Sequence, residues 1–127
     1  MIELRKNIRY RTMARARIEG VTEGETLLKD ISITGCRVEC TSYAEIKPHT
    51  QYVIEIIPEN LANVASFELT AETSWTRSEG YSCEIGFSII ESPKRKQFLR
   101  YVDYLAWRYT QGNSMTSRIS PETPSEI

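Results

Sequence analysis

Two clusters of polar residues in this 127-residue chain have the types and spacing needed to bind an anion. The first is a basic run near the N-terminus that contains Arg5, Lys6, Arg9 and Arg11. Arginine has a planar fork that binds phosphate oxygens in pairs and a flat face that stacks on purines. The basic run therefore suits a small anionic ligand, although alone it is more typical of a solvated arm.

The second cluster is the segment from Asp30 to Gly35. Side chains alternate along a strand, so Asp30 and Ser32 share one face and two isoleucines the other. After Gly35 the apolar positions change from odd to even numbers, which indicates a bulge or a sharp bend at the glycine. This pattern predicts a strand edge that carries a carboxylate and a hydroxyl beside a glycine that lets a ligand approach the backbone.

Together the two clusters resemble the motifs of the PilZ domain, the bacterial receptor module for the second messenger cyclic di-GMP. Arg5 and Arg9 match its RxxxR motif, and Asp30, Ser32 and Gly35 match its (D/N)xSxxG motif further along the chain. The resemblance covers roughly residues 4 to 108. It implies a six-stranded antiparallel β-barrel with a C-terminal α-helix.

The resemblance also implies a function, nucleotide binding in signal transduction. The arginines would bind the phosphates and guanines of cyclic di-GMP, Asp30 would accept hydrogen bonds from guanine N1 and N2, and Lys6 and Arg11 would add positive charge. Family members often carry a further arginine before the first motif arginine, which helps to capture a second dinucleotide. This chain has Leu4 there, which favours one ligand per site.

The expected output is a change of surface that is relayed to a downstream protein effector. Residues 5–11 repel one another and have little to bury, so we expect this segment to be mobile without ligand and to fold onto the barrel when cyclic di-GMP binds. The sequence does not identify the effector or its pathway.

Charge is unevenly distributed along the chain, although the net charge is −1. Residues 1–20 carry six Lys and Arg against two Asp and Glu, whereas residues 21–92 carry four against twelve. Residues 93–109 are basic again, with five against one. An acidic body repels a long polyanion, so this distribution favours a small anionic ligand over nucleic acid.

The elements that must position these clusters are mostly short strands. Alternating or β-branched runs predict strands over 13–19, 51–57, 66–76 and 81–89, and one strand or a strand pair over 27–40. Trp75 and Tyr81 fall on the apolar phase and are expected to face the core. Short strands joined by turns indicate an antiparallel sandwich or a small barrel, in agreement with the fold that the resemblance implies.

The period changes from strand to helix after Pro93. Four apolar residues at helical spacing predict a helix of about four turns that packs on other structure: Phe98, Val102, Leu105 and Tyr109. From residue 110 the chain is polar and rich in Ser, Thr and Pro. We therefore expect one domain over 1–109 and a disordered tail over 110–127.

The sequence does not favour an enzyme. It offers no nucleophile with a nearby base, no phosphate loop and no metal-ligand pattern, so neither a cofactor nor a catalytic or metal site is predicted.

Cys36, Cys40 and Cys83 fall on apolar phases and are expected to be buried and reduced. No apolar run is long enough to span a bilayer and the start lacks the apolar stretch of a secretory signal, so a cytoplasmic location is expected.

Two alternative functions stay open. One is a PilZ-like adaptor that binds a partner protein and no nucleotide, which the presence of all five motif residues disfavours. The other is a barrel that binds single-stranded nucleic acid, with Tyr10, Trp75 and Tyr81 as stacking surfaces. The oligomeric state, monomer or homodimer, is also open.

Overall fold

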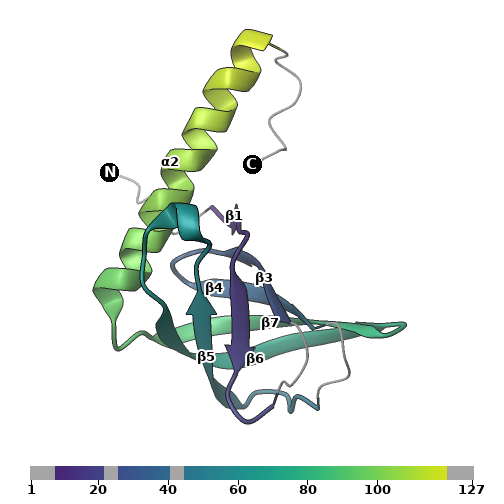
Figure 1. The fold of residues 1–127 in the computed structure, drawn as a ribbon. Coiled ribbons are helices and arrows are strands. Elements are labelled where there is room, and N and C mark those ends of the chain that lie inside the picture. The colour runs from purple at the N-terminus through teal and green to yellow at the C-terminus, as the bar shows by residue number, and fades with distance from the viewer. Residues whose placement is uncertain (1–7, 22–25, 41–44, 120–127) are drawn as a thin grey trace.

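A computed structural model of the chain describes residues 8–21, 26–40 and 45–119. It shows a closed barrel of six antiparallel strands with one extra strand and one long C-terminal helix (Figure 1). The barrel strands are β2 (Arg15–Ile18), β3 (Thr26–Ile31), β4 (Gly35–Cys40), β5 (Gln51–Ile57), β6 (Phe67–Glu79) and β7 (Ser82–Glu91). The prediction of a six-stranded antiparallel β-barrel with a C-terminal helix is therefore confirmed.

The barrel closes because each of its strands pairs with two neighbours. The order around the ring is β2, β3, β4, β7, β6, β5 and back to β2. Alternating residues of each strand face the interior and form the core, where Ile18, Val38, Ile54, Leu69 and Ile85 are fully buried. Burial of this apolar surface is the main stabilising contribution to the fold.

The segment predicted as one strand or a strand pair is the hairpin of β3 and β4. The chain reverses over residues 32–34, where the Ser32 amide donates a hydrogen bond to the Gly35 carbonyl at 2.8 Å. The register between the two strands also shifts between Leu28 and Asp30. This bulge brings Lys29 and Asp30 onto the outer face together, and each forms an ion pair with a residue of β4.

The extra strand, β1 (Tyr10–Arg11), lies beside β3 and pairs Tyr10 with Ile31 and Arg11 with Asp30. Tyr10 is 3% exposed, and its ring meets the ring of Tyr109 edge to face at 6.0 Å. The structure thus places Tyr10 and Arg11 in a strand, where the tyrosine supplies apolar surface to bury; the expectation that residues 5–11 are mobile without ligand stays a prediction.

The helix α2 (Arg95–Ile119) covers one end of the barrel with its first half and then projects away from it (Figure 1). Its buried residues include Phe98 and Tyr101, whose rings pack against Phe67 of β6. The helix is longer than predicted: residues 110–119, expected in a disordered tail, continue it. Adding residues to an existing helix is easy in the absence of proline, and the next proline is Pro121. Residues 120–127 lie outside the described residues.

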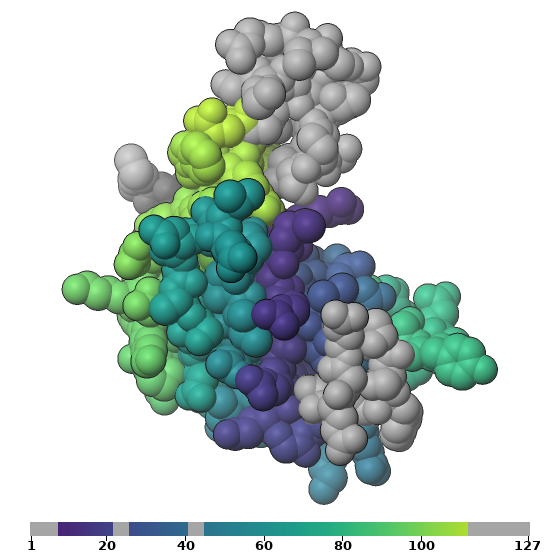
Figure 2. Space-filling model, viewed as in Figure 1, coloured from purple at the N-terminus to yellow at the C-terminus, as the bar shows by residue number. Residues whose placement is uncertain are grey.

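Two aromatic side chains that were expected to face the core are exposed on the β6–β7 hairpin, which protrudes from the side of the barrel (Figures 1 and 2). The register between β6 and β7 shifts between Thr73 and Trp75, so the alternation slips and Trp75 is 43% exposed. Tyr81 belongs to the turn between the strands and is 94% exposed.

A short 3-10 helix, η1 (Asn60–Ala62), connects β5 to β6. None of the helices in the described part of the chain has the length and hydropathy that a membrane span requires.

Candidate functional site

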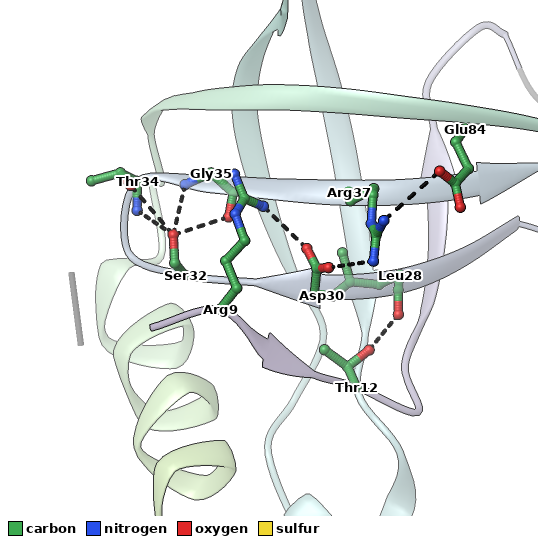
Figure 3. A network of polar contacts seen from close by, with 9 residues as sticks. All are labelled: Arg9, Thr12, Leu28, Asp30, Ser32, Thr34, Gly35, Arg37 and Glu84. Carbon is green, nitrogen blue, oxygen red and sulfur yellow. Dashed lines mark hydrogen bonds and ion pairs between the residues drawn. The ribbon is translucent and has the colours of Figure 1, made fainter. Parts of the chain in front are cut away.

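The two polar clusters of the sequence meet on the outer face of the barrel at Asp30 (Figure 3). Arg9 Nη1 lies 3.1 Å from Asp30 Oδ1, and Arg37 Nη2 lies 2.8 Å from Asp30 Oδ2. The Asp30 residue is only 7% exposed, so its carboxylate is buried between two guanidinium groups. Both oxygens are paired with opposite charges, which offsets the cost of burying the carboxylate.

Gly35 makes room for Arg9 on the β3–β4 turn. A Cβ atom at Gly35 would lie 3.0 Å from Nη2 of Arg9 and 2.9 Å from the carbonyl oxygen of Phe87. Any larger residue would therefore push against both the arginine and the neighbouring strand. The Arg9 side chain lies in the space that the sequence assigns to a ligand.

Ser32 shapes the same turn (Figure 3). Ser32 is 3% exposed, and its Oγ accepts hydrogen bonds from the amides of Thr34 at 3.2 Å and Gly35 at 3.1 Å. The hydroxyl is therefore engaged by the backbone, and its contact with a ligand stays a prediction.

The structure brings most of the predicted site residues into one neighbourhood. Arg11 is exposed on β1, directly opposite Asp30, and its carbonyl accepts a hydrogen bond from Arg108 of α2. Arg5 and Lys6 lie outside the described residues. The remaining predicted residues surround the β3–β4 turn: Arg9, Arg11, Asp30, Ser32 and Gly35.

A row of cross-strand partners extends this neighbourhood over five strands. Each residue in the row is the register partner of the next one on the adjacent strand: Arg11, Asp30, Arg37, Gly86 and Trp75. Residues directly opposite each other in antiparallel strands lie on the same face of the sheet. Adjacent strands are about 4.8 Å apart, so the row is about 19 Å long.

A chain of alternating charges runs along this row. Glu84 Oε1 lies 3.8 Å from Nη1 of Arg37 and 2.6 Å from Nη2 of Arg77. The Arg77 guanidinium in turn lies 6.0 Å from the centre of the Trp75 ring, in cation–π geometry. Three arginines and two carboxylates therefore alternate from one end of the chain to the other: Arg9, Asp30, Arg37, Glu84 and Arg77.

The Trp75 ring lies against the backbone at Gly86. A Cβ atom on that glycine would lie 2.2 Å from the indole Nε1, so the position must be glycine for the ring to fit. The exposed part of the ring offers an aromatic surface beside cations, which is what a stacked base requires. The sequence analysis missed this contact, although a glycine inside a strand pattern is a signal of close approach.

A groove with a volume of about 620 Å³ adjoins the row at Arg11 and Arg37. Lys29 and Arg108 also line it, together with apolar residues that include Met13, and no carboxylate is among the described residues that line it. The volume is typical of small-molecule sites, which measure about 300–1,000 Å³. The groove suits a ligand that combines negative charge with flat or apolar parts.

The cysteine side chains near this face are buried. Cys36, between Gly35 and Arg37, faces the core, and burial raises the pKa of its thiol to about 12, partly opposed by the nearby charge of Arg9. A thiol with such a pKa stays protonated near neutral pH and is a poor nucleophile. Cys40 and Cys83 are also buried and free, so the prediction of buried, reduced cysteines is confirmed.

Comparisons with models of protein families, with curated proteins and with solved structures find no match for this chain. Among the described residues, no group of three or more His, Cys, Asp or Glu side chains is arranged to hold a metal ion. Function has therefore to be inferred from the residues and their geometry.

Proposed function

We propose that this protein is a PilZ-type receptor that binds cyclic di-GMP on the barrel face around Asp30. The observation that carries the proposal is the contact between Arg9 and Asp30 at 3.1 Å. These residues belong to two motifs that resemble the ligand-binding motifs of one family, and they are 21 positions apart in the chain. Their convergence at one place supports a common function.

The chemistry of the face matches the chemistry of the ligand, which carries two phosphates and two guanines. Arg9 and Arg11 are exposed cations that suit phosphate oxygens. An arginine that reaches O6 and N7 of a guanine contributes about 1–3 kcal/mol of discrimination. Stacking of a base on an aromatic side chain such as Trp75 contributes about 1–3 kcal/mol as well.

Binding in this mechanism begins with the release of Arg9 from Asp30. The two guanidinium groups cover the carboxylate, which is only 7% exposed, so a guanine reaches it only when one of them moves aside. Arg9 is the group that leaves, because its side chain is 53% exposed and contacts Asp30 through one nitrogen. Arg37 is 34% exposed and is held by both Asp30 and Glu84.

The released arginine then binds a phosphate, and the freed carboxylate oxygen accepts from guanine N1 and N2. Arg9 directly precedes β1, which packs against α2 through Tyr10. Movement of Arg9 therefore changes the surface next to the helix, where a downstream protein effector would detect it. In this role the chain is a binding module without catalytic activity or cofactor, and a cytoplasmic location stays an expectation.

Isothermal titration calorimetry with cyclic di-GMP tests the proposal. We expect saturable binding by the full chain and a loss of at least about tenfold in affinity for Arg9→Ala. Arg17→Ala is the matched control, because Arg17 is also an exposed arginine and pairs with Glu55 on another part of the barrel. Absence of binding, or equal heat with cyclic di-AMP, would overturn the proposal.

A second candidate function, binding of single-stranded nucleic acid, is favoured by one observation. Trp75 and Tyr81 are both exposed on the same hairpin, which offers two stacking surfaces. The acidic charge of residues 21–92 opposes this function. Binding of a labelled oligothymidine without binding of cyclic di-GMP would support it, and a folded chain that binds neither would support the adaptor function.

A further inference from the structure

We propose that Glu84 is a positioning residue of the cyclic di-GMP site, because it holds Arg37 and Arg77 in the places where they meet the ligand. A carboxylate beside a doubly anionic ligand would then strengthen binding. This inference rests on the proposed function and deepens it, since it extends the site from the two sequence motifs to β6 and β7.

The geometry of Glu84 links two arginines that lie on different strands. Its side chain is 16% exposed, and one oxygen, Oε1, contacts Arg77 at 2.6 Å and Arg37 at 3.8 Å. Arg37 is the register partner of Gly86, and the guanidinium of Arg77 lies over the Trp75 ring. Glu84 thus stands between the arginine that holds Asp30 and the arginine that contacts the exposed aromatic surface.

One donor of Arg37 has no hydrogen-bond partner among the described residues. Its Nε is buried and has no hydrogen-bond partner among the described residues, although both Nη atoms contact carboxylates. Buried donors in proteins are nearly always satisfied, so an orphan one points to an acceptor that binds there. A phosphate or guanine oxygen is an acceptor of this kind.

Preorganisation explains why a carboxylate would help an anion to bind. A free arginine loses rotamer freedom when it contacts a ligand, and this loss weakens binding. Glu84 holds both arginine side chains in place before the ligand arrives, so most of their rotamer freedom is already lost in the free protein and binding does not have to remove it. Its repulsion of the ligand is weakened because two guanidinium groups neutralise its charge.

Glu39 provides a matched control for the charge of Glu84. The two glutamates are direct register partners on β4 and β7 and lie on the same face. Glu39 pairs with Lys29 at 3.5 Å, and no ion pair joins it to an arginine within the described residues. Substitution of either glutamate by glutamine removes one negative charge at nearly the same place.

The experiment compares Glu84→Gln with Glu39→Gln by calorimetric titration of cyclic di-GMP, with the melting temperature of each variant measured in parallel. Charge alone predicts equal or tighter binding for both variants. The positioning role predicts that Glu84→Gln binds at least about fivefold more weakly, whereas Glu39→Gln binds as well as or better than the unmodified chain. Equal changes in the two variants would overturn the inference.

Arg77→Gln keeps the inference testable if Glu84→Gln is poorly folded, and it should weaken binding because it removes one of the two arginines that Glu84 holds. In a double-substitution cycle the combined variant should lose less than the product of the two single losses, because both changes break the contact between Glu84 and Arg77. Independent, multiplying losses would contradict the positioning role. If the unmodified chain binds no cyclic di-GMP, the proposed function fails too; if Arg9→Ala abolishes binding but Glu84→Gln has no effect, this inference fails alone.

Discussion

Replacement of Gly86 by alanine tests whether Trp75 is held against the barrel face as the structure shows. The added Cβ would lie 2.2 Å from Nε1 and 2.3 Å from Cε2 of the indole. Non-bonded carbon atoms stay about 3.5–4.0 Å apart, so the ring has to move by more than about 1 Å. Because the clash involves the ring and the strand backbone, we expect the indole to leave its place.

The size of the effect follows from the surface that the ring covers. Trp75 is 43% exposed, so more than half of its surface is buried. Half of the roughly 200 Å² that a buried aromatic covers, at about 25 cal/mol per Å², corresponds to about 2.5 kcal/mol. The displaced ring regains some contacts, so we expect the free energy of unfolding to fall by about 1–2.5 kcal/mol. Loss of one stacking surface should also weaken cyclic di-GMP binding by about fivefold or more.

The assay uses the fluorescence of Trp75 together with urea unfolding. The chain has two tryptophans, so a Trp107→Phe background makes Trp75 the only one. Gly86→Ala should shift the emission to longer wavelength and lower the urea midpoint. In a Trp75→Ala background the same methyl group meets no ring, so the loss of stability should disappear. An unchanged emission maximum, or an equal loss in both backgrounds, would refute the reasoning.

Three further predictions concern the buried carboxylate, the buried thiol and the attachment of β1. Asp30→Asn removes the counter-charge of Arg9 and one of the two carboxylates that contact Arg37, so unfolding in urea should show a loss of about 1–3 kcal/mol; a loss no larger than that of Glu55→Gln, at an exposed ion pair, would contradict this. Burial raises the pKa of the Cys36 thiol to about 12 from 9.0, so the thiol loses its proton at a lower pH in the unfolded chain than in the folded one. Its contribution to the free energy of unfolding should be fully present below about pH 9 and should fall by up to about 1.4 kcal/mol per pH unit as the pH rises toward 12. Cys36→Ala should reduce that slope, and an identical slope would sink the explanation. Arg108→Ala removes the hydrogen bond to the Arg11 carbonyl, so hydrogen exchange of the β1 amides should accelerate several-fold while that of β6 is unchanged.

Much of the barrel could be predicted from local patterns in the sequence. The strand over 51–57 was predicted with the bounds that β5 has, because an apolar, β-branched run ends there at Pro58. The alternation over 13–19 likewise indicated the buried side chains of Ala14, Ala16 and Ile18. Such patterns are reliable where one face of a strand is buried along its whole length.

The candidate site was predicted in part. The motifs named Arg9 and Asp30 as ligand-binding residues, but not that they pair with each other in the absence of a ligand. Arg37 was not singled out, because nothing in its local sequence distinguishes it from any other arginine on the polar face of a strand. Its role at Asp30 appears only when β4 lies in register beside β3.

Local sequence patterns are enough to predict the strand and helix periods and the inward residues of most strands, and they contain the two motifs that suggest a dinucleotide receptor. That Trp75 faces outward onto Gly86 and that Glu84 joins two arginines follows only from the assembled barrel. These arrangements depend on the registers between β4, β7 and β6 and on an irregularity between Thr73 and Trp75. A shift of one residue moves every following side chain to the opposite face, and such a shift is set by the closure of the barrel, which no local pattern encodes.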